Sequence, residues 1–188
     1  MNPGSEETIR IDKLVDACMH NDSKAQVELY EFFARTLYNT SLRIVQDTML
    51  AEDIVQESFM KAFASLAQFR KEVPFVIWLR RIVINKSLDA LRKRKVEFLP
   101  IEENMAIDDS ETENDRTIAE MNTSTVLKIK QAVNNLTDGY RIIFSLFYFE
   151  GYDHDEIAQI MNISPSTSRS QLTRARQKVI SQMKNQAL

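Results

Sequence analysis

The sequence contains little glycine, proline, cysteine or histidine, and each scarcity excludes a class of protein. Its 188 residues include 3 Gly and 4 Pro, which is too few for a collagen-like repeat or for a chain built mainly of loops. The single cysteine, Cys18, excludes a disulfide within the chain and a cysteine-based zinc cluster. With only two histidines, we expect no metal site and no cofactor. Both of them, His20 and His154, are expected at the surface.

Long apolar runs are also missing. No stretch approaches the roughly 20 apolar residues of a membrane-spanning helix, and the first residues lack the basic start and apolar core of a signal peptide. The sequence therefore predicts a cytoplasmic protein without membrane insertion. It also lacks a glycine-rich phosphate loop and a plausible Cys–His pairing, so an enzymatic function has little support.

Acidic residues are concentrated in one segment of the chain. The formal net charge is −3. Residues 97–120 contain nine acidic residues and one basic residue, a local charge of −8, which leaves a charge of +5 for the rest of the chain. Two mildly basic blocks therefore flank an acidic segment, and the acidic average does not exclude a nucleic-acid partner.

The acidic segment is the predicted boundary between two domains. It has weak apolar periodicity, and such a segment cannot bury enough surface to offset the entropy lost on ordering. We expect an all-α protein in which two small helical domains, residues 1–96 and 123–188, are joined by a flexible acidic linker, residues 97–122. Fully extended, this linker can span roughly 80 Å.

The first block has the apolar periodicity of helices along most of its length. Asp22 or Ser23, and then the pair Asp47–Thr48, are suitable N-caps for successive helices. Residues 68–72 are expected to form a loop before a helix whose end is strongly basic. Cations at that end also complement the helix dipole.

The second block predicts four helices, the last two of which are joined by a short turn. Asp153, followed three residues later by Glu156, forms a capping box that opens the third helix. Ser164 and Pro165 suit the N-cap and the first position of the fourth helix, and Asn162 in the turn tolerates the left-handed conformation. This arrangement is typical of a DNA-binding helix-turn-helix, although an αα-hairpin with a solvated polar face has the same outline.

The last two helices place apolar side chains inward and DNA-compatible side chains outward. Arginine can bridge two acceptors on guanine, glutamine can pair with adenine, and serine and threonine suit phosphates. The inward set is Ile157, Ala158, Ile160, Ile163, Leu172, Ala175 and Val179. The outward set is Arg169, Ser170, Gln171, Thr173, Arg174 and Lys178.

Three motifs, in this order, resemble those of bacterial RNA polymerase sigma factors of the extracytoplasmic-function (ECF) group of the sigma-70 family. The resemblance covers about residues 10–183 and includes the acidic linker between the second and third motifs. The motifs are AEDIVQESFMKAF (51–63), FRKEVPFVIWLRRIVINKSLDALRKRK (69–95) and GYDHDEIAQIMNISPSTSRSQLTRARQKV (151–179).

The resemblance implies a factor that binds core RNA polymerase and directs promoter-specific initiation of transcription. A region 2-like domain at residues 1–96 would bind polymerase and the −10 element, and a region 4-like helix-turn-helix domain at residues 123–188 would bind the −35 element. The implied partners are core RNA polymerase, through its β′ clamp helices and β flap, promoter DNA, and an anti-sigma factor. The implied location is the cytoplasm, at the nucleoid when the factor is active.

The first motif matches the segment that docks on the β′ clamp helices. Its polar side chains share one face of a helix whose other face carries Phe59 and Phe63, so charged residues surround an apolar contact. The alternative is a solvated face with an i,i+4 ion pair such as Glu57–Lys61. The implied core-polymerase contacts are Asp53, Gln56, Glu57 and Met60.

The second motif matches the region that reads the −10 element, where promoter opening needs a pocket for an unstacked base and cations along the strand. Trp78 suits either base stacking or a core position between Phe75 and Ile82. Residues 71–74 replace the family's Gly/Ser-containing version of the capture loop, which leaves the −10 preference open. The implied contacts are Phe69, Arg70 and Lys71 in the loop, Asn85 at the flipped base, and Arg81, Lys86, Arg92 and Lys93 at phosphates.

The third motif matches the helix that reads the −35 element, and two of its positions depart from the family pattern. Ser168 stands where an apolar, buried residue is usual, which predicts a helix that is held less firmly. Thr173 replaces a commonly larger side chain, which predicts an altered base preference. The implied −35 contacts are Ser166, Thr167, Arg169, Ser170, Gln171, Thr173, Arg174 and Lys178.

The acidic linker has two functional interpretations besides that of a solvating tether. By resemblance, it is a strand threaded through the polymerase toward the RNA exit channel, where negative charge mimics nucleic acid. A further hypothesis is that it screens the basic faces of the free protein. Two other classes of function stay open: a helix-turn-helix regulator that binds duplex DNA tightly without polymerase, and a helical adaptor that does not depend on DNA.

Overall fold

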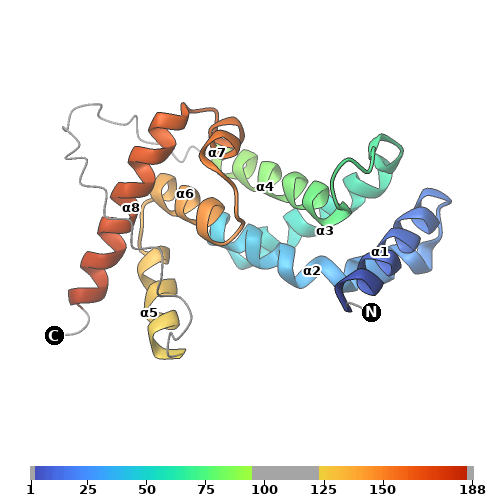
Figure 1. Ribbon diagram of the computed structural model, residues 1–188, viewed down its shortest axis with the longest axis horizontal. Coiled ribbons are helices and arrows are strands. Elements are labelled where there is room, and N and C mark those ends of the chain that lie inside the picture. Colours follow the sequence, from blue (N-terminus) through green and yellow to red (C-terminus); the bar gives the residue numbers. More distant parts are fainter. Residues whose placement is uncertain (1–2, 95–122, 186–188) are drawn as a thin grey trace. The chain divides into compact units, whose positions relative to one another are not determined.

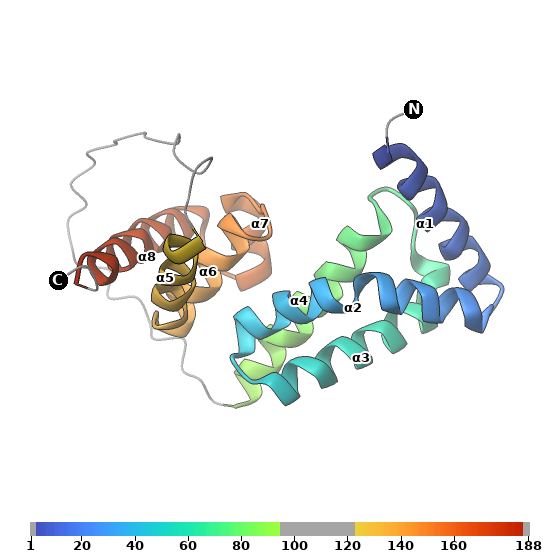
Figure 2. The ribbon, with the colours of Figure 1, turned by 90° about the horizontal axis from the view of Figure 1, so that it is seen from below.

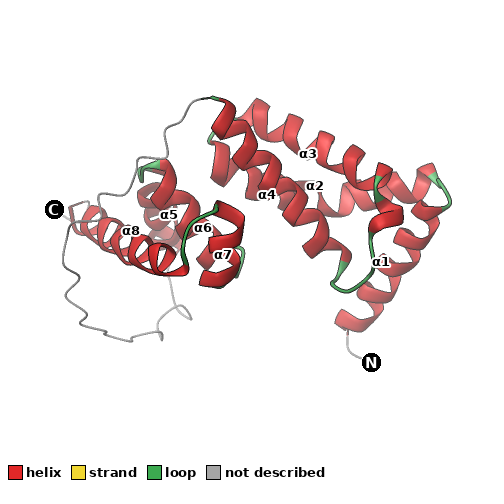
Figure 3. Cartoon of the chain, turned by 90° about the horizontal axis from the view of Figure 1, so that it is seen from above, coloured by secondary structure: helices red, strands yellow, loops and turns green. Residues whose placement is uncertain are grey.

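The computed structural model describes residues 3–94 and 123–185, and within these ranges every regular element is a helix (Figures 1 and 3). The all-α fold expected from the sequence is confirmed. The helices form two compact units, one within residues 1–95 and the other within residues 96–188. The predicted linker lies outside the described residues. Within the described ranges, none of the helices is long and apolar enough to cross a membrane.

The first unit is built from four helices and one short turn of 3-10 helix. Helix α1 spans Pro3–Met19, α2 Ser23–Val45, α3 Thr48–Ala64 and α4 Phe75–Lys93, and η1 covers Leu66–Gln68. Helices α2, α3 and α4 all pack against one another, and α1 packs along α2 and also touches η1 and α4 (Figure 2). Their apolar faces meet in a core that includes Leu29, Leu37, Ile54, Leu79 and Ile84.

Side-chain caps fix where α2 and α3 begin. The Oδ1 atom of Asp22 accepts hydrogen bonds from the backbone N–H groups of Lys24 and Ala25, at 2.8 and 3.3 Å. Asp47 accepts one from the N–H of Leu50 at 2.9 Å. Because the first N–H groups of a helix have no partner within the helix, these carboxylates stabilise the N-termini of α2 and α3. Asp22 is therefore the residue that caps α2, and the cap expected at Asp47 is confirmed.

Two buried serines lie where α2 and α4 approach each other. Ser41 and Ser87 are fully buried, and their hydroxyl oxygens lie 3.0 Å apart. Ser87 donates its own hydrogen bond to the carbonyl oxygen of Val83 at 2.8 Å, so Ser41 donates to Ser87. Both hydroxyl groups thus have partners in an apolar interior, as buried polar groups require.

The second unit is built around one long helix. Helix α5 spans Thr123–Asn134, α6 Asp138–Tyr148, α7 His154–Met161 and α8 Pro165–Asn185, and α8 contacts each of the other three. Within residues 123–185, the expected number of four helices is confirmed. The expected inward side chains of α7 and α8 are buried, except that Ile163 is half-buried.

The turn between α7 and α8 has the geometry predicted for a helix-turn-helix. The Asp153 carboxylate accepts a hydrogen bond from the N–H of Glu156 at 2.8 Å, and the Glu156 carboxylate accepts one from the N–H of Asp153 at 3.0 Å. This capping box is confirmed, as is the cap of α8, where the Oγ atom of Ser164 accepts from the N–H of Thr167 at 3.0 Å. Between them Asn162 is left-handed, with φ 57° and ψ 52°.

Substitution of Asn162 tests how much this turn depends on its left-handed residue. Asn162→Ala should lower the free energy of unfolding of the second unit by about 1 kcal/mol, because a Cβ atom strains this conformation and alanine lacks the amide that offsets the strain. Asn162→Gly is the matched control and should be close to the wild type. Hydrogen exchange of the α7 and α8 amides in the full-length protein measures the difference, and equal protection in the two variants would contradict the prediction.

Candidate functional site

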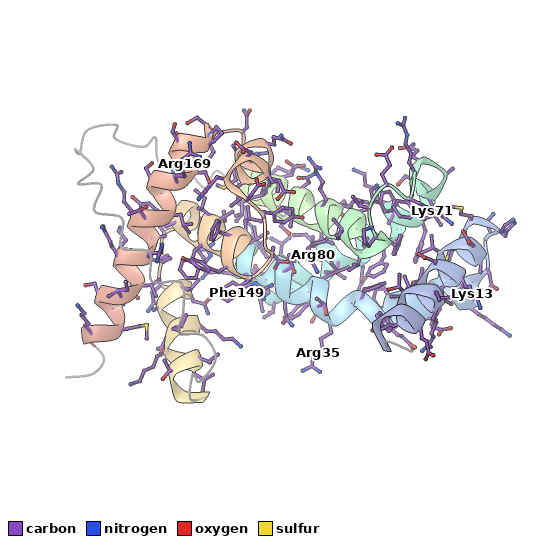
Figure 4. The ribbon with its side chains drawn as sticks, viewed as in Figure 1. Lys13, Arg35, Lys71, Arg80, Phe149 and Arg169 are labelled. Carbon is purple, nitrogen blue, oxygen red and sulfur yellow. The ribbon has the colours of Figure 1, made fainter. Side chains whose placement is uncertain are left out.

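Helix α8 presents cations without a compensating acid. The α8 range carries five basic residues, Arg169, Arg174, Arg176, Lys178 and Lys184, and no Asp or Glu. Figure 4 shows Arg169 in the first half of the helix. Such a face attracts phosphate through its charge and offers arginine to base edges. Of the expected DNA contacts on α8, Ser166, Arg169, Thr173 and Lys178 are exposed, and Thr167, Ser170 and Arg174 are half-buried.

Hydroxyl groups cluster at the N-terminus of α8. The Oγ atom of Ser164 lies 2.8 Å from the Oγ atom of Ser166 and 2.7 Å from the Oγ1 atom of Thr167. At the same helix end, backbone N–H groups and the helix dipole favour a phosphate. The structure therefore places Ser166 and Thr167 together where a DNA backbone contact is physically favourable.

Gln171 does not lie on the outward face, and its expected position is wrong. Its side chain is 8% exposed, and its Oε1 atom lies 3.9 Å from the point where a Cβ atom would stand on Gly139 of α6. Because each residue of a helix is rotated by about 100° from the last, Gln171 belongs to the inward face with Ser168 and Leu172. A polar side chain next to other polar side chains gave no signal of this burial.

Ser168 and His154 join α8 to α7. Ser168 is fully buried, and its Oγ atom lies 2.9 Å from the Nδ1 atom of His154. The His154 ring stacks on Phe147 of α6, with ring centroids 5.0 Å apart and planes at 27°. His154 was expected at the surface, and the structure places its ring half-buried between helices. Ser168 stands where an apolar residue is usual, so the apolar contact between the helices is missing at this position. The hydrogen bond to His154 takes its place.

The surroundings of His154 favour its neutral form. Burial lowers the pKa of His154 below its ordinary value, and the positive charge of Arg169 lowers it further. The carboxylates of Asp153 and Asp155 oppose this shift. A proton on the ring would therefore be unfavourable at the contact that joins α7 to α8.

The stability of the second unit should consequently fall as the pH drops below about 6.5. Unfolded His154 titrates near that pH, whereas folded His154 titrates lower, so its contribution is complete above that pH and is lost as the pH falls through the folded pKa. Urea unfolding followed by the NMR signals of α8 at pH 7.5 and 5 measures the effect. His154→Gln should reduce the pH dependence and the control His20→Gln should not; a His154→Gln variant that behaves like the wild type would refute the assignment.

Helix α3 displays the side chains expected to meet core polymerase. Met60 is 71% exposed, and it stands on the solvent side of α3 with three polar residues. Beside them, a hollow of about 300 Å³ runs between α2 and α3, lined among others by Arg35 of α2 and Glu52 of α3; Figure 4 shows Arg35 extending away from α2. These two charged residues were not predicted, because they come from different helices. These three polar residues, all exposed, are the expected contacts Asp53, Gln56 and Glu57.

One ion pair connects two predicted contact surfaces of the first unit. The Lys86 ammonium group of α4 donates to the Glu57 carboxylate of α3, in place of the Glu57–Lys61 pair considered from sequence. The hydrogen bond from Lys86, together with its charge, holds the pKa of Glu57 below its usual range. A residue expected to meet polymerase and a residue expected to meet DNA therefore bind each other in the free protein.

Phe69 lies at the base of the predicted capture loop and is not an accessible base contact, so this expectation is wrong. It is 9% exposed, and its ring centroid lies 5.7 Å from that of Phe75 and 5.1 Å from that of Trp78. Trp78 is half-buried in the same aromatic cluster, which favours its core interpretation. Aromatic rings bury a large apolar area and gain more from such packing than from exposure.

The loop itself, residues 70–74, is exposed at every position. Lys71 is left-handed, with φ 58°, and its Nζ atom lies 2.5 Å from the Oδ1 atom of Asp16 on α1. Beneath the loop is a hollow of about 380 Å³. Asn85 is exposed on α4 but is not among the residues that line this hollow.

The remaining expected contacts follow the exposed side of α4. Arg81 and Asn85 are exposed and four residues apart, which places them on one helix face. Arg92 pairs with Asp89 at 3.0 Å, and Lys93 is exposed at the end of the helix. Among the described residues, no group of three His, Cys, Asp or Glu side chains is placed to hold a metal ion.

Two helical units, one of them a helix-turn-helix whose second helix is cationic, define a DNA-binding protein of the helix-turn-helix class. Two family models match the chain, one for Sigma-70 region 2 at residues 29–97 and one for Sigma-70 region 4 at residues 127–179. A relative in Bacillus subtilis, the ECF RNA polymerase sigma factor SigM, is 30% identical over 158 residues, covering 81% of this chain and 91% of the relative. The chain belongs to the ECF group of RNA polymerase sigma factors and directs promoter-specific transcription.

Another relative agrees with this family, and two solved structures share the fold. RNA polymerase sigma-H factor of Pseudomonas aeruginosa is 27% identical over 176 residues, covering 89% of this chain and 90% of the relative. The fold resembles that of CnrH in its complex with the cytosolic domain of CnrY (TM-score 0.55, 19% identity, 92% of this chain and 96% of the other). It also resembles the sigma factor RpoE of Bartonella quintana in complex with the anti-sigma factor NepR (TM-score 0.56, 23% identity, 84% and 95%).

Proposed function

We propose that the two units divide promoter recognition between them. Residues 1–96 bind core RNA polymerase and capture the melted −10 element, residues 123–188 bind the −35 element as duplex, and residues 97–122 connect the two. The observation that carries this proposal is the cationic, acid-free helix α8, held in a capped helix-turn-helix. A single strand and a duplex need different surfaces, since a strand is bound by cations and stacking and a duplex by groove contacts.

In the second unit, the first three turns of α8 enter the major groove. Arg174 contacts a base edge, Arg169 contacts a base edge or a phosphate, and Thr173 reads a neighbouring base through its hydroxyl group. Lys178 contacts a phosphate from the flank of the helix, where its ammonium group lies 4.7 Å from the centroid of the Tyr140 ring. Ser166 and Thr167 bind the DNA backbone at the helix end, with Ser170 beside them. Gln171 supports α8 from its buried side.

In the first unit, the exposed side of α4 and the loop before it bind the opened strand. Arg70, whose side chain is 83% exposed, lies at the loop, and Arg81 and Asn85 continue the surface along α4. Lys86, Arg92 and Lys93 contact phosphates, which requires Lys86 to exchange Glu57 for the DNA. Trp78 supports this surface from the aromatic cluster beneath it.

The exposed side of α3 docks on the β′ clamp helices of the polymerase. Met60 supplies the apolar centre of this contact, with Asp53, Gln56 and Glu57 around it, because interfaces combine a buried apolar centre with a polar rim. The β flap binds the second unit. Two proteins of this fold were solved in complexes, CnrH with the cytosolic domain of CnrY and the sigma factor RpoE with the anti-sigma factor NepR. The second complex supports an anti-sigma factor as a further partner of this chain.

The protein acts as a binding factor in the cytoplasm, at the nucleoid when active, and not as an enzyme. Burial raises the pKa of Cys18 to about 11, so its thiol stays protonated and is a poor nucleophile. Reconstitution with core polymerase on a promoter library tests the whole proposal. Start sites that appear only with polymerase support it, whereas tight duplex binding without any effect on polymerase would support a helix-turn-helix regulator instead.

Replacing Asp53 and Gln56 together by alanine should weaken binding to core polymerase about tenfold or more, as expected for the loss of two interface contacts. Both side chains are exposed, so folding should be unaffected. Competition for core polymerase measures the change. Glu31→Ala, on the exposed side of α2, is the control, because it also removes one negative charge. Unaltered competition by the double variant would remove α3 from the interface.

Arg174→Gln should lower the affinity for −35 duplex by about 1–3 kcal/mol and relax the base preference at one position, because it removes a base contact.

Lys178→Gln should weaken binding evenly across sequences and reduce the salt slope by about 1, because it removes a phosphate contact. Fluorescence anisotropy on a set of duplexes measures both. Lys184→Gln in the last turn of α8 is the control; if it equals Arg174→Gln, the effect is one of net charge alone.

A further inference from the structure

The loop at residues 70–74 is fixed at its two ends but spans a hollow between them. Phe69 and Phe75 are buried on either side of it, with ring centroids 5.7 Å apart. The hollow of about 380 Å³ beneath the loop is lined by Thr8, Ile11 and Asp12 of α1 on one side and by residues 71–76 on the other, among others. Figure 2 shows this segment running beside α1. Because the middle of the loop lacks close packing from below, its conformation depends on specific contacts.

Lys71 makes such a contact. It is left-handed, a conformation that costs a residue with a Cβ atom on the order of 1 kcal/mol and persists when neighbours hold it. Its ammonium group pairs with the carboxylate of Asp16 at 2.5 Å. Figure 4 shows Lys71 in the loop that lies beside α1. The pair therefore ties the conformationally unfavourable point of the loop to a rigid helix.

We propose that Asp16 is a positioning residue for −10 recognition, which acts through Lys71 to hold the capture loop in its reading conformation. Helix α1 thereby becomes a part of the −10 reader, although it precedes residues 29–97, where the region 2 model matches. This inference rests on the proposed function of the loop. It also changes the role of Lys71, from a residue of the capture loop that contacts DNA to the anchor of that loop.

The two roles of Lys71 predict opposite effects of the same substitution. If Asp16 positions the loop, Asp16→Asn frees the loop and lowers the discrimination between −10 sequences. If Lys71 binds a phosphate, Asp16 competes with DNA for the ammonium group, and Asp16→Asn should raise affinity evenly for all sequences. An exposed ion pair is worth at most about 1 kcal/mol, so the expected loss of discrimination is about two- to fivefold.

The test uses the full-length protein with core polymerase and a promoter library randomised at the −10 positions. The readout is the ratio of initiation from the sequences that the wild type prefers to initiation from the remainder. Glu28→Gln is the matched control. It also removes one carboxylate from an ion pair of α1, here the pair between Arg10 of α1 and Glu28 of α2, which lies away from the loop. Asp16→Asn should lower the ratio two- to fivefold, and Glu28→Gln should leave it unchanged.

A second pair of variants separates loop conformation from charge. Lys71→Ala and Lys71→Gly both remove the ammonium group, but glycine adopts the left-handed conformation freely. The proposal predicts that Lys71→Gly keeps more discrimination than Lys71→Ala, whereas loss of a phosphate contact would weaken both equally. An even gain in affinity for Asp16→Asn, or a ratio equal to that of the wild type, would overturn the inference and leave the proposed function intact. A wild type without any −10 preference would overturn the proposed function itself.

Discussion

The direction in which each helix leaves a turn depends on residues other than glycine that adopt the left-handed backbone conformation. In the described residues they are Asn21, Gln46, Lys71 and Asn162, and each stands where the chain turns between helices. Because such a conformation is strained for a residue with a Cβ atom, each needs a local stabilising interaction. The N–H of Gln46 donates to the carbonyl oxygen of Leu42 at 2.9 Å, and Lys71 pairs with Asp16. A chain with 3 glycines thus couples its turns to particular side-chain and backbone contacts.

Ion pairs within the first unit occupy groups that the proposed function assigns to partners. Glu57 pairs with Lys86 across two helices, and Arg92 pairs with Asp89 within one. Exposed pairs of this kind contribute little to stability. Under the proposed function, however, DNA binding exchanges them, which would lower the affinity of the free protein for DNA. Docking of α3 on polymerase would engage Glu57 in a contact with the polymerase and leave Lys86 available for a phosphate. The arrangement is therefore consistent with a factor that binds its −10 strand only together with polymerase.

Features that depend on local signals were predictable from the sequence, whereas features that depend on a neighbouring helix were not. Caps at Asp47 and Asp153 were predictable because they depend on residues within one turn. The burial of Gln171, by contrast, involves another helix, where its side chain lies beside Gly139. Phe69 is likewise drawn inward by Phe75 and Trp78, although it adjoins an exposed loop. The polar pattern of a helix or loop shows which side chains can be exposed. Packing against neighbouring elements decides which of these side chains are exposed in the fold.

The rotation of α8 about its axis decides which side chains meet DNA, and polar contacts on its buried side set that rotation. A rotation by one residue, about 100°, would replace the whole outward set. Apolar contacts alone discriminate poorly between such registers, because leucine and alanine fit several neighbours. The hydrogen bond between Ser168 and His154 fits one register, since a rotation of α8 by one residue would carry the hydroxyl group away from the ring. The serine that seemed to loosen the helix therefore orients the face that carries Arg169 and Thr173.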